Sequence, residues 1–311
     1  MWPLGLKRKR QLPVSLATMP GLAVAVRMSP GPEGRAHLRE VRVLHSESSA
    51  TERLDQLARE LRIKQAPLQI LLEAADYQFM QTEFPSLPVE ELRTAIGWQM
   101  KDMLRQPLDQ STLDILPPPA QGDGIRRTQG YVVSAANNLL RSRMLQFRAY
   151  GSDVAVIDIP EQAQRNLADC LETPGHATAI LALTPAGCLL TVSREGELYF
   201  VRNFELGGPL AENEHARREQ FDRLVLELQR SFDVLEHQFS FLSLSTLWLA
   251  PFSHMEELFG LLIDTLYLPV KIVVLEELFD CRECPLPGDP TQRGALFHVL
   301  GLALRAVGEP A

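Results

Sequence analysis

Three short apolar runs stand one after another in the middle of the chain: Ala177-Thr-Ala-Ile-Leu-Ala-Leu183, Cys188-Leu-Leu-Thr-Val-Ser193 and Leu198-Tyr-Phe-Val-Arg-Asn-Phe204. Each run has the length and composition of a β-strand. The last two are separated by Arg194-Glu-Gly-Glu197, which suits a hairpin turn. The stretch therefore predicts a three-stranded meander.

A long helical segment follows this meander at 211–239. Its apolar positions from Phe221 to Phe239 are spaced by four and three residues in turn. A coiled-coil seam has the same spacing, but fewer than three heptads are present, so we expect a helix that packs in the core of this same chain. This half ends with a strand at 246–250, a helix at 255–267, a strand at 270–275 and a helix at 294–307.

The first half of the chain shows a similar mixture. Strand-like runs at 22–28 and 36–44 flank the turn cluster Ser29-Pro-Gly-Pro-Glu-Gly34, which predicts a hairpin. The residues before 21 show no such pattern, so we expect a basic N-terminal tail at 1–20. The remaining elements of this half are a helix at 51–63, strands at 68–72 and 154–159, and a helix at 160–171.

A compact segment interrupts the first half at 77–150. It contains strands, helices and a Pro- and Gly-rich loop of its own, in the order strand 77–84, helix 89–104, strand 112–116, strand 131–136 and helix 139–150. Glu172-Thr-Pro-Gly175 is the best domain boundary. We therefore predict a two-lobed α/β fold, with lobes at 21–172 and 173–311 and a small α+β domain inserted into the first.

Composition excludes several classes of function. The formal net charge of −8 argues against a general nucleic-acid binder. No apolar run approaches the roughly 18 residues of a membrane-spanning helix, and four cysteines in 311 residues do not indicate a disulfide framework. No nucleophile elbow, zinc-protease motif or P-loop occurs. We therefore expect a cytoplasmic protein that is not an enzyme.

Four segments resemble PilM-like proteins of bacterial pilus systems. They are Leu87-Pro-Val-Glu-Glu-Leu-Arg93 with Ile96-Gly-Trp-Gln99, Val156-Ile-Asp-Ile-Pro-Glu161, Val192-Ser-Arg-Glu-Gly-Glu-Leu-Tyr-Phe-Val-Arg202 and Leu300-Gly-Leu-Ala-Leu-Arg305. The resemblance spans about residues 20–306 and is greatest to the PilM-like protein of mannose-sensitive haemagglutinin pilus systems. It implies a two-lobed actin-like (ribonuclease H-like) fold with ATP between the lobes. It also implies a partner, the cytoplasmic peptide of a PilN-like single-pass inner-membrane protein.

The nucleotide site that this resemblance implies needs three turns. Two are Asp-x-Gly turns for phosphate and Mg²⁺, and the third is a Gly-Gly turn near the adenosine. The hairpin at 22–31 has no Asp, Ala182 and Thr184 stand where the second Asp and Gly belong, and Ala250-Pro251 replaces the glycine pair. We therefore expect no cofactor. A relocated or weak site for ATP and Mg²⁺ stays open, built on Thr184, Gly187, Gly207 and Gly208.

The helix at 89–104 carries a candidate partner surface. Helical spacing places a buried stripe at Leu92, Ile96, Met100 and Met103. Trp98 falls nearly opposite this stripe, beside Thr94, Lys101 and Arg105. A large aromatic side chain on a polar face suits docking, so we expect these four residues to contact the PilN-like partner. The alternative is that Trp98 packs on a neighbouring part of the same chain.

Two further motifs carry weaker signals. Lys7, Arg8, Lys9 and Arg10 follow an apolar tip, which suits either weak contact with an anionic membrane surface or a solvated tail. Cys281-x-x-Cys284 has zinc-knuckle spacing, but the chain has no second cysteine pair to complete four ligands. We therefore expect two free thiols and no metal site.

The sequence thus favours a non-catalytic pilus-assembly scaffold that sits at the inner membrane. One alternative is an ATP-binding PilM-type protein of a pilus or type II secretion system. A second is a sugar-kinase-like enzyme, for which no phosphate loop or catalytic Asp can be placed.

Overall fold

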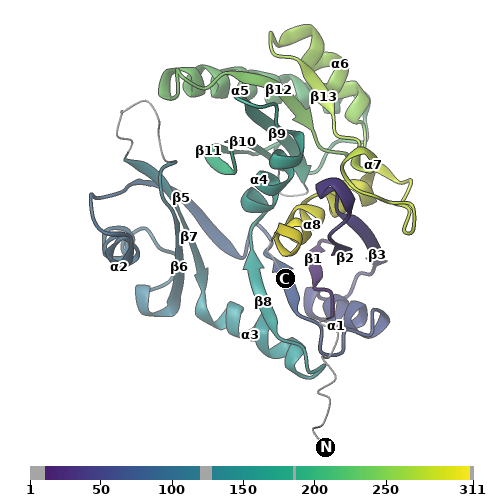
Figure 1. Cartoon of the computed structure of the whole chain (residues 1–311). Coiled ribbons are helices and arrows are strands. Elements are labelled where there is room, and N and C mark those ends of the chain that lie inside the picture. The colour runs from purple at the N-terminus through teal and green to yellow at the C-terminus, as the bar shows by residue number, and fades with distance from the viewer. Residues whose placement is uncertain (1–10, 120–127, 185–186, 309–311) are drawn as a thin grey trace, which may run out of the picture.

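Two five-stranded sheets of the same topology form the frame of the protein (Figure 1). The computed structural model describes residues 11–119, 128–184 and 187–308. In the first sheet the order is β3-β2-β1-β4-β8, and in the second it is β11-β10-β9-β12-β13. The first three strands of each sheet form an antiparallel meander, and the last two run parallel to the meander's first strand.

The first sheet contains one strand more than we expected. Its strands are β1 (Val14–Met19), β2 (Leu22–Ser29), β3 (His37–His45), β4 (Leu68–Leu71) and β8 (Val154–Asp158). The prediction of a loose tail at 1–20 is therefore wrong for residues 14–19. β1 lies in the middle of the sheet and is covered on both faces, so its sequence lacks the alternation of a half-exposed strand. Its buried Ser15 and Thr18 are satisfied by hydrogen bonds to Gln69 and Glu73.

The segment at 77–150 forms a third sheet of three strands beside the first lobe (Figure 1). Its order is β5-β7-β6, from β5 (Tyr77–Glu83), β6 (Ser111–Leu116) and β7 (Gln129–Ala136). Helix α2 (Val89–Met100) packs on it through Leu92, Ile96 and Met100. Helix α3 (Asn137–Arg148) leads back to the first lobe, where Phe147 is fully buried among residues of that lobe.

Helices cover the outer faces of both sheets. In the first lobe the covering helix is α1 (Ala50–Glu60). The second lobe consists of β9 (Ala177–Thr184), β10 (Gly187–Arg194), β11 (Glu197–Phe204), α5 (Glu214–Gln238), β12 (Leu244–Leu249), α6 (Met255–Thr265), β13 (Val270–Ile272) and α7 (Leu275–Leu278). Phe221, Leu228 and Leu235 of α5 are buried against the sheet, which confirms the prediction of a core helix.

Two helices lie between the sheets and pack together. Helix α4 (Pro160–Leu171) follows the first sheet but packs on β9, β10 and β11, whereas α8 (Pro290–Gly308) follows the second sheet but packs on β1, β2 and β4. The predicted lobes at 21–172 and 173–311 therefore need a correction, because each lobe receives a helix from the other half. At Gly301 the helices approach so closely that a Cβ would overlap the carbonyl oxygen of Ala163.

Candidate functional site

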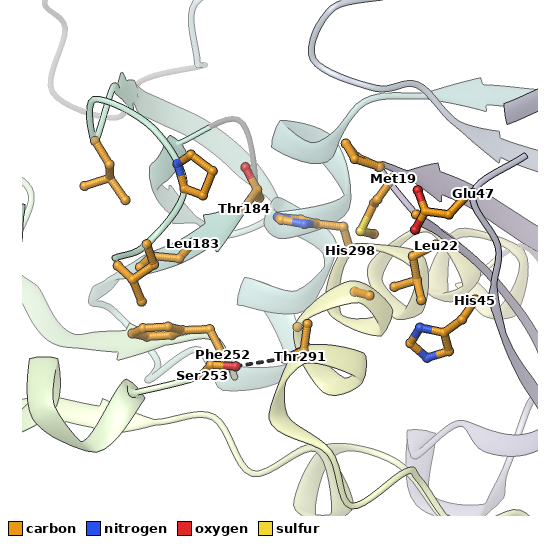
Figure 2. A pocket seen from close by; sticks show the side chains of 17 residues that line it. Met19, Leu22, His45, Glu47, Leu183, Thr184, Phe252, Ser253, Thr291 and His298 are labelled. Atoms are coloured by element: carbon orange, nitrogen blue, oxygen red, sulfur yellow. Dashed lines mark hydrogen bonds between the residues drawn. The ribbon is translucent and has the colours of Figure 1, made fainter. Parts of the chain in front are cut away.

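A cavity of about 490 Å³ opens between the lobes, and we call it the interlobe cavity (Figure 2). The first lobe contributes the β1–β2 turn and two residues at and after the end of β3. The second lobe contributes the end of β9, the loop after β11 and the turn after β12. Its described lining residues are Met19, Pro20, Gly21, Leu22, His45, Glu47, Leu183, Thr184, Leu206, Pro209, Leu210, Phe252, Ser253, Thr291, Gly294, Ala295 and His298.

The lining of this cavity is mostly apolar. Among its described residues there is no lysine or arginine, and Glu47 at the exposed rim is the one carboxylate. Polyphosphates bind where cations and free backbone N–H groups converge. A carboxylate without a cation opposes such a ligand. The described walls of the cavity therefore suit an uncharged ligand better than a nucleoside triphosphate.

The turn that borders the cavity is not the one that we expected. We looked for the first nucleotide turn in the hairpin at 22–31, but the turn of that hairpin, at 30–36, contributes nothing to the described lining. The β1–β2 turn lies there instead and reads Met19-Pro-Gly-Leu22. Pro20 has no N–H to offer, and neither β1 nor this turn contains an Asp. The Asp-x-Gly pattern is therefore absent at the corrected position as well.

Of the four residues proposed for a relocated nucleotide site, only Thr184 is among the described residues that line the cavity. Its hydroxyl donates to the carbonyl of Gly187 at 3.1 Å. Gly187 serves packing, because a Cβ there would overlap the carbonyl oxygen of Phe204. Gly207 and Gly208 have φ of 75° and 132° and lie between the lining residues Leu206 and Pro209. Gly187, Gly207 and Gly208 are therefore outside the described lining of this cavity.

His298 is a buried residue in the wall of this cavity that was not among the predicted site residues. Its ring projects from α8 and is only 4% exposed. Its Nε2 lies 3.0 Å from Oε1 of Gln164 on α4. Burial lowers the pKa of His298 to about 4, so the imidazole is neutral at physiological pH. Its sequence neighbours are apolar, and nothing in the sequence pairs it with Gln164, which is 134 positions away.

Three of the four residues of the predicted partner surface are exposed at α2, but the fourth, Arg105, does not share their face. Trp98 is 64% exposed, so the described part of the chain leaves most of it uncovered. Thr94 and Lys101 are exposed as well. The helix ends at Met100, four residues earlier than expected. Met103 is therefore 61% exposed instead of buried, and Arg105 is not on the helical face of Trp98.

Arg105 is held by the inserted domain instead. Its backbone N–H donates to Oε1 of Gln78 at 2.6 Å, and its guanidinium reaches the carbonyls of Ala75 and Tyr77 at 3.4 Å. Its neighbour Gln106 begins the wall of a hollow of about 420 Å³, which we call the insertion groove. One wall is formed by the segment at 106–110 and the other by the end of β7 and α3, all within the inserted segment at 77–150. The lining residues are Gln106, Asp109, Gln110, Ala136, Asn137, Asn138, Arg141, Ser142 and Leu145.

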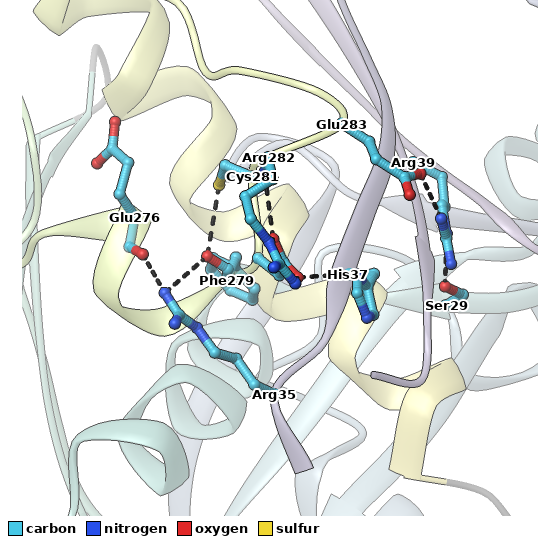
Figure 3. A network of polar contacts seen from close by, with 10 residues as sticks. Ser29, Arg35, His37, Arg39, Glu276, Phe279, Cys281, Arg282 and Glu283 are labelled. Atoms are coloured by element: carbon cyan, nitrogen blue, oxygen red, sulfur yellow. Dashed lines mark hydrogen bonds and ion pairs between the residues drawn. The ribbon is translucent and has the colours of Figure 1, made fainter. Parts of the chain in front are cut away.

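The Cys281–Cys284 motif belongs to a surface segment that is fastened to β3 (Figure 3). Asp280 exchanges backbone hydrogen bonds with Ala36 and Leu38, at 2.9 and 3.0 Å, and its carboxylate lies 3.1 Å from Nδ1 of His37. Both thiols are free, and burial raises the pKa of Cys281 to about 11. Within the described ranges no three His, Cys, Asp or Glu side chains gather as a metal site would need.

Two remaining observations concern membranes. Lys7, Arg8, Lys9 and Arg10, the proposed membrane contacts, lie outside the residues that the structure describes. Across the described part of the chain, no helix is both long and apolar enough to cross a bilayer.

Comparison with known proteins identifies the fold. No family model matches the chain, and no curated protein matches it. Among solved structures, a PilM-PilN type IV pilus biogenesis complex is similar, with a TM-score of 0.73 at 20% identity over 97% of this chain and 100% of that chain. A Bacteroides thetaiotaomicron protein with an actin-like ATPase fold and unknown function has a TM-score of 0.54 at 9% identity, over 88% and 93% of the two chains. The chain has a two-lobed actin-like fold, as its sequence predicted.

Proposed function

We propose that this chain is a non-catalytic cytoplasmic scaffold of a type IV pilus assembly machine, of the mannose-sensitive haemagglutinin type. In this role it holds the cytoplasmic segment of a PilN-like inner-membrane protein. The observation that carries the proposal is the insertion groove, within a fold that matches the full length of a chain from a PilM-PilN complex. The assignment to this pilus type rests on the four sequence segments at 87–99, 156–161, 192–202 and 300–305.

The interlobe cavity supports the non-catalytic part of this proposal. Its described walls have no cation for a triphosphate, and the turn beside β1 and β2 has no Asp for Mg²⁺. We propose that the scaffold works without a nucleotide or metal. The alternative, an ATP-binding PilM-type protein, would have to bind phosphates without a lysine or arginine in the described lining.

The docking surface has an apolar and a polar part. Trp98 and Met103 expose large apolar side chains on the inserted domain, and Leu145 does the same at the insertion groove. Arg141 and Asp109 line that groove and can pair with charged or backbone groups of a peptide. Apolar anchors surrounded by polar groups are typical of peptide recognition sites.

The test measures binding of a synthetic peptide that copies the N-terminal cytoplasmic segment of the PilN-like protein from the same organism. We expect Trp98→Ala to weaken binding by about 2 kcal/mol or more, roughly 30-fold in Kd, because exposed tryptophans are frequent interface hot spots. The melting temperature should change little, because the Trp98 side chain is outside the core.

Two further variants make this test decisive. Tyr267→Ala removes a fully exposed aromatic side chain on the second lobe and should leave binding unchanged. Arg141→Glu reverses a charge inside the insertion groove and should weaken binding. If Arg141→Glu weakens binding but Trp98→Ala does not, Trp98 loses its role and the groove remains. If both variants bind the peptide like the unmodified protein, the docking proposal is wrong.

A further inference from the structure

The hydrogen bonds around Gln164 fix which nitrogen of His298 carries the proton. The amide nitrogen of Gln164 donates to the carbonyls of Ile180 and Leu189, at 2.6 and 3.3 Å. Its Oε1 must therefore be the atom that faces His298, and it can only accept. Because the imidazole is neutral, Nε2 is the protonated nitrogen and Nδ1 is an acceptor.

That acceptor has no partner within the described part of the chain. No hydrogen bond joins Nδ1 of His298 to another described residue, although only 4% of the residue's surface is exposed. Nδ1 is not one of the described fully buried atoms that lack a partner, so it is open to water or to a ligand. His298 lines the interlobe cavity, and Figure 2 shows its ring at the wall between the two lobes.

The surroundings of Nδ1 restrict the chemistry of a ligand. Leu22, Leu183 and Phe252 are among the apolar side chains that line the cavity, and they favour an apolar body. No described lining residue is a lysine or an arginine, and Glu47 at the rim repels anions. The hydroxyls of Ser253 and Thr291 are hydrogen-bonded to each other at 2.7 Å, so they compete less for a ligand donor.

We propose that the interlobe cavity binds a small uncharged molecule with an apolar body and one N–H or O–H group, which donates to Nδ1 of His298. This inference goes beyond the docking role and does not depend on it. The volume of about 490 Å³ falls in the range of small-molecule sites. Because both lobes line the cavity, a bound molecule contacts both and should stabilise the folded protein.

The test compares three probes of similar shape on the unmodified protein. Indole is uncharged and carries one N–H donor, benzofuran replaces that N–H by an ether oxygen, and indole-3-acetate adds a negative charge. We expect indole to bind with a Kd of about 1 mM or tighter by calorimetry or NMR titration. Benzofuran should bind about five-fold or more weakly, because it cannot donate to Nδ1. Indole-3-acetate should bind more weakly than indole because of Glu47.

Two variants locate the binding. Ala295→Leu adds bulk to the cavity wall and should abolish indole binding. His298→Phe removes the acceptor and should make indole and benzofuran bind equally. Leu226→Ala on the exposed face of α5 is the control and should change neither affinity. Equal binding of indole and benzofuran to the unmodified protein, or indole binding that survives Ala295→Leu, would overturn the proposal. Absence of measurable indole binding would overturn it too.

Discussion

His298 is the residue whose chemistry the fold changes most clearly. An exposed histidine titrates near pH 6.5, but burial lowers the pKa of His298 to about 4. Its Nδ1 is an acceptor only in the neutral ring, whereas Nε2 can donate to Gln164 in either protonation state. The residue therefore links the stability of the protein to pH.

The sign of this pH dependence follows from linkage. The folded state binds the His298 proton more weakly than the unfolded state does, so its contribution is complete above about pH 6.5 and is lost as the pH falls toward 4. The maximum loss is on the order of 3 kcal/mol. Glu161 acts in the opposite sense, because burial raises the pKa of its carboxyl and folding then favours the protonated form.

We expect His298→Asn to reduce the loss of stability between pH 6.5 and pH 4.5. Denaturant unfolding of the unmodified protein and the variant across this range would measure it. Comparing the two slopes cancels the contribution of Glu161 and other groups. Parallel curves for the two proteins would show that His298 does not titrate on unfolding.

At the scale of elements, the crossing of α4 and α8 joins the two lobes. The two helices pack face to face, and each covers the sheet that the other half of the chain supplies. Gly301 permits the close approach, because its missing side chain leaves room for the carbonyl of Ala163. The side chain of Asn166 donates to the carbonyl of Gly301 at 2.9 Å and fixes the register.

We expect Gly301→Ala to lower the free energy of unfolding by about 1–3 kcal/mol, because the added methyl group forces the helices apart. Gly260→Ala is a matched control, since Gly260 lies in α6 with nothing within 4 Å of a Cβ. That change should raise stability by about 0.5–1 kcal/mol through helix propensity. The contact at the crossing would be unimportant if both substitutions proved stabilising.

At the scale of the whole molecule, the interlobe cavity should distinguish the proposed nucleotide-free protein from an ATP-binding one. We expect Mg-ATP at about 1 mM to leave the melting temperature unchanged, because a ligand stabilises only in proportion to its occupancy. Differential scanning fluorimetry with and without Mg-ATP would measure this. A rise of several degrees would favour the ATP-binding alternative.

Local pattern determined much of this protein. The order of strands and helices from 22 onward, apart from the short α7, follows from periodicity and turn residues. So do the hairpins, the helix at 214–238 as a core element and the exposed side of Trp98. These features depend on residues close together in the chain. The absence of an Asp-x-Gly pattern could also be read from the sequence, although we placed the first turn in the wrong hairpin.

Tertiary structure decided the features that depend on contacts between residues far apart in the sequence. β1 is a strand because its neighbours in the sheet bury it and supply Gln69 and Glu73 for its hydroxyls. Helix α8 belongs to the sheet of the opposite half because its apolar surface is better buried there. The pairing of His298 with Gln164 joins residues 134 positions apart. Contacts at such separations leave no periodic trace in a single sequence, because what selects them is the burial and hydrogen bonding that the assembled fold provides.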